Sequence, residues 1–426
     1  MEYARTSIRT LLKSVRPLSV AVKRAREKRT EFYRFQKRVH RDTWARHDNI
    51  LRWADQCLSQ QTELEAEDRY TRTDDPVVRQ GYALKKKVEA EFRNKHVDWS
   101  DVRILIQRQN YEQSIGGYSL FGNLAMSLQF MGINVTTVST REEFAGSLNE
   151  FRPTVLLTSD DDRDRSVIDW NMFERFRLEN NCALGLTASL EEFGNAPLVG
   201  RLRWARSHNV NFYYCFSPQE YLRARAEYSP FWEEGYKILS LEFGANVLKY
   251  YPVPDITRDL DYVFLGSRNK VKWDRYVTFF DRIGREYPGF VHGGGWLKLK
   301  DQSINTDRDR YFYARARICL NLHTRHEIQW PLECNERSYM LAACGAPMLI
   351  DNPARLKSIF PDGSVFSASS PDEYFELFRF MLANPQEVQR RTLLAQSEIM
   401  NKYNTFTRAE GFVTHLKRQV DQVGSL

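Results

Sequence analysis

The stretch NERSYMLAACGAPMLIDNP, residues 335–353, carries the clearest structural signal in the chain. A polar and charged start leads into a run of small side chains, which is typical of a helix that lies close to a neighbouring layer. Gly345 then ends this helix, because glycine readily adopts the left-handed conformation that closes helices. The following residues, PMLID, are apolar up to a final aspartate and predict a short buried strand. The stretch therefore predicts one helix and strand of an α/β domain.

The same alternation of strands and helices extends over most of the chain. The segment DVRILIQ (101–107) predicts a buried strand, and a glycine-containing loop, a helix and a second strand follow it as a βαβ unit. We predict an open α/β domain over residues 100–255, a second one over 260–400 after a proline-containing linker, and a C-terminal helix over 401–426. Further strands of the first domain are expected at 153–159, 182–188, 211–217 and 246–254.

Composition is that of a globular protein. The chain has 426 residues, of which 42% are hydrophobic and 27% charged, and this excludes disorder as a general description. No window holds about 18 consecutive apolar residues, so no membrane span is expected. No apolar run follows the first basic residues, so we expect no secretory signal. The six cysteines form no C-x-x-C pair, which predicts free buried thiols in a reducing cytoplasm.

Positive charge is concentrated at the N-terminus. Residues 1–41 hold 13 Lys or Arg and three Glu, an excess of +10, whereas the whole chain is only +7, so the other residues sum to about −3. Polar helical patterns continue to about residue 95, and Asp75 is placed to cap a helix that begins at Pro76. We therefore expect residues 1–95 to form a basic helical extension separate from the main body.

The basic segment also has apolar residues at near-helical intervals. This combination suits an anionic membrane surface, where each Lys or Arg near the headgroups contributes roughly 1 kcal/mol. A solvated helical hairpin is the alternative interpretation of residues 1–41. No base-reading module follows the segment, so no nucleic-acid partner is expected. We therefore expect a cytoplasmic protein whose basic segment either binds peripherally at the inner face of the membrane or is solvated.

Four motifs of the second half occur in a particular order. They are DYVFLGS followed by a basic helix, YFYARARICLNLH, NERSYMLAACGAPMLID and the helical stretch that begins DEYFELFRFML. In this order they resemble the CgeB-like glycosyltransferases, a branch of the GT-B superfamily, closely over residues 260–415 and loosely over 100–420. The resemblance implies the GT-B fold, in which two Rossmann-like domains face a cleft. The first domain would bind the acceptor and the second the nucleotide-sugar donor.

The resemblance also implies a phosphate-side loop after the first strand of the second domain. Gly266 and Ser267 lie where this strand ends, and their backbone N–H groups are placed to meet a phosphate. Arg268 and Lys272 add positive charge that would stabilise a departing diphosphate, although a basic surface loop is the alternative. His323, after the strand RICLNL, is expected either to face the donor or to have a structural role.

The helix that begins near residue 335 is expected to face the same cleft. Arg337 can form a fork to phosphate oxygens, Glu336 can accept sugar hydroxyls, and Asn335 either contacts the ligand or caps the helix. Many GT-B enzymes have a glutamate five residues before the glycine of this helix, where it holds the ribose, but this chain has Met340. Glu336 or Glu333 takes over that role, or the ribose is held differently.

Three residues are candidates for a catalytic base on the acceptor side. Asp160 and Asp162 follow a strand of the first domain in the stretch TSDDDRDR, and His208 is the third candidate. We expect the aspartates at the cleft, because the carboxyl ends of parallel strands meet at one edge of a sheet. A solvated acidic loop is the alternative. Gly116 and Gly117 either form an acceptor-side loop or serve a turn.

These features predict a hexosyltransferase-like enzyme that moves a sugar from a nucleotide diphosphate sugar to a glycan, lipid-linked or protein acceptor. No His or Cys spacing indicates zinc. The resemblance implies that a helix dipole and basic side chains replace a bound divalent metal, so no metal and no cofactor are expected beside the substrate. A nucleotide-sugar epimerase and a non-catalytic nucleotide- or sugar-binding protein are the alternatives.

Overall fold

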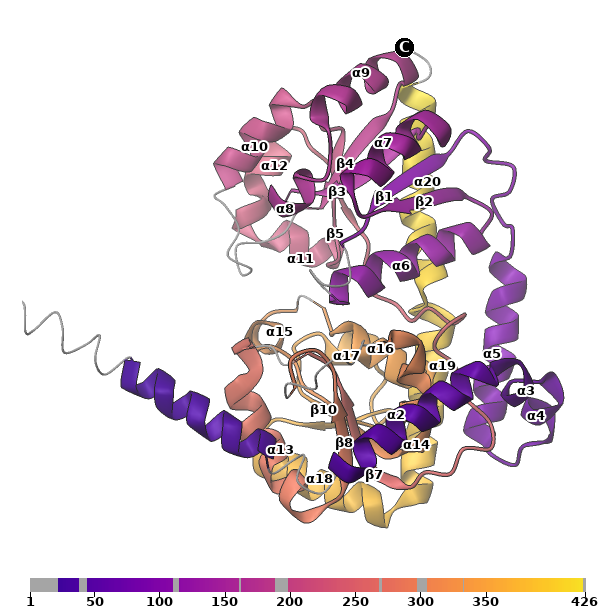
Figure 1. The fold of residues 1–426 in the computed structure, drawn as a ribbon, viewed down its shortest axis with the longest axis vertical. Helices are drawn as coiled ribbons and strands as arrows, with labels where there is room; N and C mark the ends of the chain where they lie inside the picture. Colours follow the sequence, from indigo (N-terminus) through magenta and orange to yellow (C-terminus); the bar gives the residue numbers. More distant parts are fainter. Residues whose placement is uncertain are drawn as a thin grey trace, which may run out of the picture.

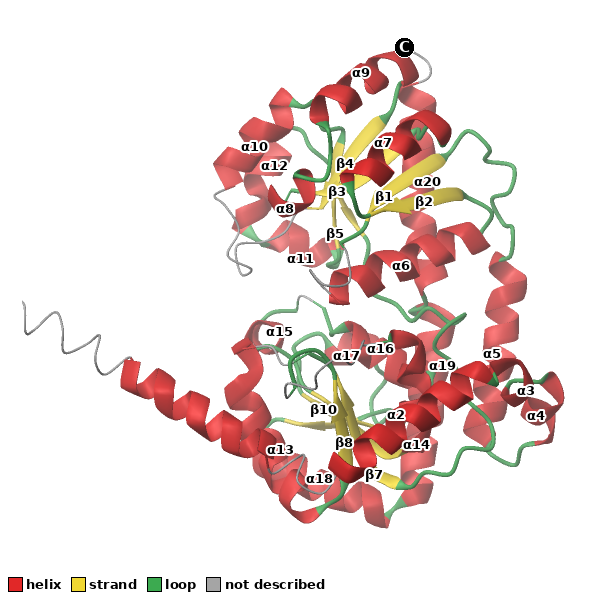
Figure 2. Ribbon diagram, in the orientation of Figure 1, coloured by secondary structure: helices red, strands yellow, loops and turns green. Residues whose placement is uncertain are grey.

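The chain folds into two α/β domains, which lie one above the other in Figure 1. Each domain surrounds one parallel sheet, and helices cover the sheets (Figure 2). The expected α/β class is therefore confirmed. The computed structural model describes residues 22–37, 44–109, 115–160, 162–187, 198–267, 270–296, 305–331 and 333–423.

The first sheet has six parallel strands in the order β2-β1-β3-β4-β5-β6. The strands are β1 (Arg103–Gln107), β2 (Asn134–Val138), β3 (Val155–Ser159), β4 (Ala183–Thr187), β5 (Phe212–Cys215) and β6 (Ile238–Ser240). Strands β3 and β4 are buried along their whole length, as expected for apolar strands that are covered on both faces. The covering helices are α6 (Ile115–Phe130), α7 (Arg141–Glu150), α8 (Asp162–Arg165), α9 (Trp170–Asn180), α10 (Leu198–Ser207), α11 (Gln219–Ala224) and α12 (Ser229–Glu233).

One predicted strand of this sheet is wrong. Residues 246–254 contain no strand, and the three-residue β6 forms the edge of the sheet instead. Tyr250, Tyr251 and Val253 are nevertheless buried. The apolar run of residues 246–254 therefore belongs to a buried connection between the domains. Its apolar character alone did not distinguish it from a strand.

The second sheet has five parallel strands in the order β11-β10-β9-β7-β8. They are β7 (Leu260–Leu265), β8 (Gly289–His292), β9 (Ala316–Asn321), β10 (Met348–Asp351) and β11 (Phe366–Ala368). Its helices are α13 (Trp273–Glu286), α14 (Asp309–Arg315), α15 (Arg325–Gln329), α16 (Glu336–Ala343), α17 (Leu356–Ile359) and α18 (Pro371–Ala383).

The strand order reverses once in each sheet. In the first sheet β1 lies between β2 and β3, and in the second β7 lies between β8 and β9. At such a reversal the connections leave the two central strands in opposite directions and open a crevice at their carboxyl ends. Open α/β sheets bind ligands in this crevice. The topology therefore points to the loops that follow β7 and β9.

Helices α2 (Trp44–Ser59) and α5 (Pro76–Phe92), which precede the first domain, do not belong to a separate extension, contrary to our expectation for residues 1–95. They place Ile50, Val88 and other residues in the same apolar core as both sheets. Both helices carry many polar residues, but each has one stripe of buried apolar residues, which is how a surface helix packs on a core. The short helices α3 (Gln61–Leu64) and α4 (Glu67–Arg72) connect them.

The start of α5 follows the sequence prediction. Pro76 is the first helical residue, and Oδ1 of Asp75 accepts a hydrogen bond from the Val77 N–H at 2.8 Å. This bond satisfies one of the N–H groups that a helix leaves unpaired at its start. Residues 1–21 and 38–41 of the predicted basic segment lie outside the described residues.

Two C-terminal helices connect the domains. Helix α19 (Pro385–Lys402) packs against α5 and α16, whereas α20 (Thr405–Val423) packs against α6 and β4 of the first domain. Phe412 of α20 is buried beside Tyr214 of β5, with 5.5 Å between the ring centres. Burial of one such aromatic side chain contributes roughly 2 kcal/mol. The end of the chain is thus part of the first domain's core.

Helix α16 is narrow because three layers meet on it. Ala342 and Ala343 are buried, and both α19 and strands β9 and β10 of the second sheet pack on the helix. Gly345 has a φ of +62°, and a Cβ there would collide with Val77 of α5. Small side chains therefore allow close approach of α5 and α19 as well as of the sheet.

The described residues include no helix that is long and apolar enough to cross a membrane. All six cysteines lie within the described ranges, and five of them are buried. Burial raises the pKa of Cys319 to about 12, so this thiol stays protonated at neutral pH.

Candidate functional site

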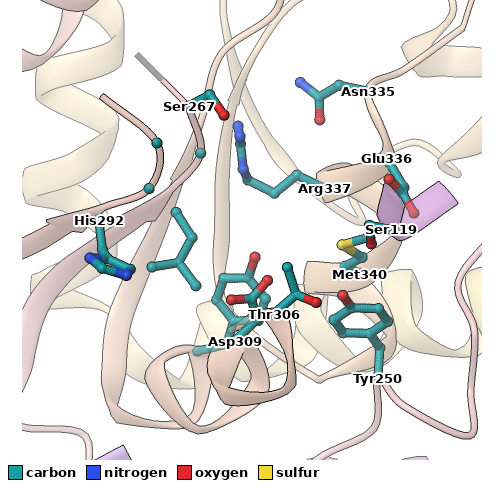
Figure 3. A pocket seen from close by; sticks show the side chains of 15 residues that line it. Ser119, Tyr250, Ser267, His292, Thr306, Asp309, Asn335, Glu336, Arg337 and Met340 are labelled. Carbon is teal, nitrogen blue, oxygen red and sulfur yellow. The ribbon is translucent and has the colours of Figure 1, made fainter. Parts of the chain in front are cut away.

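One cavity lies between the two domains, at the carboxyl edge of the second sheet. Its volume is about 240 Å³, and it is lined by the loops after β7 and β8, by α14 and by the start of α16. Ser119 of α6 adds a wall from the first domain. Figure 3 shows the lining side chains around this space. The cavity lies in the crevice that the reversal of strand order at β7 predicts.

The loop after β7 is fixed by short backbone contacts. The Gly266 N–H donates to the His292 carbonyl at 2.9 Å, and the Gly266 carbonyl accepts from Nε1 of Trp296 at 2.6 Å. Gly293, with a φ of +137°, approaches so closely that a Cβ there would collide with the Gly266 carbonyl. Gly266 and Ser267 both line the cavity. The Gly266 N–H is engaged within the protein, however, so it does not meet a phosphate as expected.

Arg337 extends from the first turn of α16 across the cavity toward Ser267 (Figure 3). Its Nη1 donates to Oδ1 of Asn321 at 3.1 Å, and its guanidinium lies 4.5 Å from the centre of the Phe264 ring. A side chain at Gly266 would collide with the guanidinium. The glycine thus makes room for the arginine, and two contacts hold its planar group at the cavity wall, in a geometry that suits phosphate oxygens.

Glu336 lines the cavity from the same turn of α16. Its Oε1 accepts a hydrogen bond from Nδ2 of Asn123 in α6 at 3.1 Å, and this bond links the two domains. Loss of water raises the pKa of Glu336 to about 7, although the Asn123 bond and the charges of Lys249 and Arg337 oppose the shift. Met340 lines the cavity one turn later. Many GT-B enzymes have a ribose-binding glutamate at the position of Met340. Among the carboxyls that line this cavity, Glu336 is the nearest to that position in the sequence.

Asp309 is a second carboxyl in the cavity, and the sequence analysis missed it. It begins α14, and loss of water raises its pKa to about 7 against the opposing charges of Lys249 and Arg337. An aspartate at the start of a helix is common, because its negative charge interacts favourably with the helix dipole. The residue type and position of Asp309 therefore did not indicate a functional site. Only the fold brings α14 opposite α16.

Asn335 and His323 support the cavity wall. Oδ1 of Asn335 accepts from the Ser338 N–H at 3.2 Å and so caps α16, while the residue also lines the cavity. The fully buried His323 contacts Asp351 of β10 through its backbone N–H at 2.8 Å and through Nδ1 at 2.5 Å. The histidine thus ties the end of β9 to β10 and does not line the cavity.

Lys272 and Glu333 both have hydrogen-bond partners within the second domain. Nζ of Lys272 donates to the Leu322 carbonyl at 3.0 Å, and burial lowers the pKa of this lysine. The buried Glu333 accepts from the Cys334 N–H at 3.0 Å and from the Tyr339 hydroxyl, and burial raises its pKa to about 8. Neither side chain lines the cavity, so of the two glutamates only Glu336 faces it.

The candidate bases of the first domain do not line the cavity. Asp160 forms an ion pair with Arg201 of α10 at 3.0 Å, with both side chains buried. His208 follows α10, where its ring stacks on Trp204 with 4.0 Å between ring centres and lies edge-on to Trp170. Both residues therefore have structural partners within their own domain. Asp162 begins α8, and its side chain lies outside the described residues.

The remaining expected residues lie near the domain boundary or outside the described ranges. Gly116 and Gly117 belong to the first turn of α6 and not to a loop before it, because the helix begins at Ile115. Ser119 of the next turn is the α6 residue that lines the cavity. Arg268 lies outside the described residues. The described residues contain no group of three or more His, Cys, Asp or Glu placed to hold a metal ion.

Part of the sequence matches a known family. Residues 275–414 match the model of a family described as glycosyl transferase-like. No curated protein matches the chain in sequence. The match covers most of the second domain and continues into α20. The match supports the resemblance to glycosyltransferases over these residues, and the CgeB-like branch stays a prediction.

Solved structures show a similar fold at low sequence identity. A T4 phage BGT variant in complex with UDP-glucose is 12% identical, with a TM-score of 0.50 over 75% of this chain and 100% of that chain. Sucrose-phosphate synthase from Thermosynechococcus elongatus is 12% identical, with a TM-score of 0.49 over 75% and 99% of the two chains. HepE from Anabaena, in complex with UDP and glucose, is 11% identical, with a TM-score of 0.48 over 74% and 100%. The likeness to the phage protein confirms the expected GT-B fold.

Proposed function

We propose that this chain, with a glycosyl transferase-like second domain and the GT-B fold, transfers a sugar from a nucleotide diphosphate sugar to an acceptor hydroxyl. One observation carries the proposal: a guanidinium and two carboxyls with pKa values near 7 meet in the cavity between the domains. A leaving diphosphate needs positive charge, and an acceptor hydroxyl needs a base. The cavity offers both within one crevice.

Arg337 is proposed to bind the diphosphate. When the bond between the sugar carbon and the diphosphate oxygen breaks, the oxygen keeps the electron pair and its negative charge increases. The guanidinium can donate a fork of hydrogen bonds to these oxygens. The arginine lies in the first turn of α16, where unpaired N–H groups and the helix dipole also favour an anion. The hydroxyl of Ser267 faces the same space (Figure 3).

Asp309 is proposed as the base. The acceptor oxygen forms its bond to the sugar carbon as its proton passes to the carboxylate, and a pKa of about 7 suits this transfer at neutral pH. Glu336, which Asn123 holds in place, is proposed to accept hydroxyls of the donor. These assignments replace Asp160 and His208, whose partners lie within the first domain.

The finer features of the reaction belong to the same proposal. The acceptor is a glycan, a lipid-linked sugar or a protein, and the reaction proceeds without a bound divalent metal because Arg337 and the helix terminus supply the positive charge. Addition of a chelator is then expected to leave the rate unchanged. A rate that a chelator abolishes and Mg²⁺ or Mn²⁺ restores would contradict metal independence.

A panel of nucleotide sugars tests the proposal. The protein is incubated with UDP-glucose and with other nucleotide sugars, each with and without glycan, lipid-linked and peptide acceptors. Free nucleotide diphosphate together with a glycosylated acceptor is the expected result. An isomerised donor would instead show an epimerase, and binding of the donor without any turnover would show a non-catalytic binding protein.

A further inference from the structure

A basic helix formed by residues 22–37 extends from the second domain, in indigo at the left of Figure 1. Residues 22–31 are exposed, whereas Phe32, Phe35 and Gln36 near its end are buried. Phe32 stacks on Trp273 with 4.7 Å between the ring centres. The helix is therefore anchored by its last turns, and its first turns are presented to the surroundings.

The anchor has a fixed position relative to the cavity. Phe35 contacts Trp296 edge-on, with 6.4 Å between ring centres, and Trp296 donates a hydrogen bond to the Gly266 carbonyl. Gly266 lines the cavity. The helix thus packs on a residue that also fixes the loop after β7, so a surface that binds the helix would hold the cavity at a defined orientation.

The exposed side of the helix carries charge and apolar groups together. The helix holds seven Lys or Arg and two Glu, a net charge of +5. Steps of three and four residues place one set of side chains on a single face, on the side of the helix opposite Phe35. We call this set the basic stripe: Val22, Arg26, Arg29, Tyr33 and Lys37. Val22 and Tyr33 are each 55% exposed, and Glu27 and Glu31 lie on another side of the helix.

We propose that the basic stripe binds the surface of an anionic lipid bilayer. Cations near the headgroups are attracted to lipid phosphates, and exposed tyrosine and valine side chains gain an apolar environment at the interface. A lipid surface therefore offers a partner to every member of the stripe. A nucleic acid would neutralise the three cations but would leave Val22 without an apolar partner.

Vesicle sedimentation of the full chain tests this proposal. Vesicles of 30% phosphatidylglycerol and 70% phosphatidylcholine are expected to bind the protein at low salt, and vesicles of phosphatidylcholine alone are not. The double substitution Arg26→Gln/Arg29→Gln should weaken binding about 25-fold, roughly fivefold for each cation removed. The substitution Tyr33→Ser should weaken it about threefold without any change of charge.

A matched pair of substitutions separates the stripe from net charge. Arg24→Gln/Lys28→Gln removes the same charge from the side of the helix that bears Phe35, and it should weaken binding less than fivefold. An equal loss for both pairs, or no binding to anionic vesicles, would overturn the proposal. Displacement of the protein from vesicles by duplex DNA at equal phosphate concentration would show a nucleic-acid partner instead. Because sedimentation involves no turnover, its result is independent of the proposed sugar transfer.

Discussion

The two sheets place charged residues at corresponding edges but use them differently. Asp160 follows β3 in the first sheet, and Arg201 of α10 neutralises it at 3.0 Å inside the domain. Arg337 lies in the first turn of α16, between β9 and β10 of the second sheet, and its guanidinium faces a cavity. Both residues lie where parallel sheets bind ligands. The topology therefore determines at which edge of a sheet a ligand can bind. Ion pairing within each domain determines which charged side chains at that edge remain available to the ligand.

The buried ion pair gives the largest expected effect. Asp160→Asn leaves Arg201 as an uncompensated buried charge, so we expect the free energy of unfolding to fall by about 3–5 kcal/mol. The value of kcat/KM for the folded fraction should change less than about threefold, because Asp160 does not line the cavity. Urea unfolding and initial rates at low temperature measure the two effects.

A double variant controls for this result. Asp160→Leu/Arg201→Met removes both charges, and it should recover most of the lost stability. A 100-fold loss of kcat/KM with unchanged stability in Asp160→Asn would break the comparison, because Asp160 would then act in the reaction.

Arg337→Ala is expected to lower kcat/KM by about 100- to 1,000-fold, the usual effect of removing a group that stabilises developing negative charge. Arg325→Ala is the matched control, because this exposed arginine of α15 pairs with Asp274 away from the cavity lining. The control should stay within about twofold of the unmodified protein. Equal losses in both variants would remove the special role of Arg337.

Asp309 predicts a pH dependence. With a pKa of about 7, the carboxyl is mostly protonated at pH 6 and ionised at pH 8, so kcat/KM should rise with pH through this range. Asp309→Asn should lower kcat/KM about 100-fold at pH 8 and abolish the rise. Because Glu336 titrates in the same cavity, the rise belongs to the coupled pair, and Glu336→Gln is the necessary comparison. A rise that Asp309→Asn leaves unchanged would contradict the assignment.

His208 gives the smallest expected effect. His208→Ala removes a ring that stacks on Trp204 and lies near Trp170, so about 1 kcal/mol of stability should be lost. The value of kcat/KM should change less than about twofold. Thermal unfolding and steady-state rates check both numbers, and a loss of activity above tenfold would restore His208 as a candidate base.

Local patterns were sufficient for the fold class but not for every element. Long apolar runs such as 155–159 and 260–265 predicted buried strands, because such runs have few alternatives in a globular protein. The three-residue β6 was too short to have a pattern. Helices α2 and α5 were placed in a separate extension because their buried stripe faces surfaces from distant parts of the sequence. A stripe of apolar residues shows that a helix packs on other parts of the protein, but it does not show which parts these are.

The site was predictable only as far as it follows strand ends. Gly266, Ser267 and Arg337 were found from their positions after strands and at a helix start, and they line the cavity. Asp309 was missed because nothing in its neighbouring residues distinguishes it from a helix-favouring aspartate. Asp160 was chosen as a candidate base because it follows a strand. Its ion pair with Arg201 could not be predicted, since Arg201 lies 41 positions later and no local pattern reveals such a pair.

A crystal structure of the chain with uridine or guanosine diphosphate tests the central claim most directly. The account predicts that the diphosphate lies in the cavity between the domains, with its oxygens about 3 Å from the Arg337 guanidinium and beside Ser267. A diphosphate bound at another place, with Arg337 still facing an empty cavity, would contradict it.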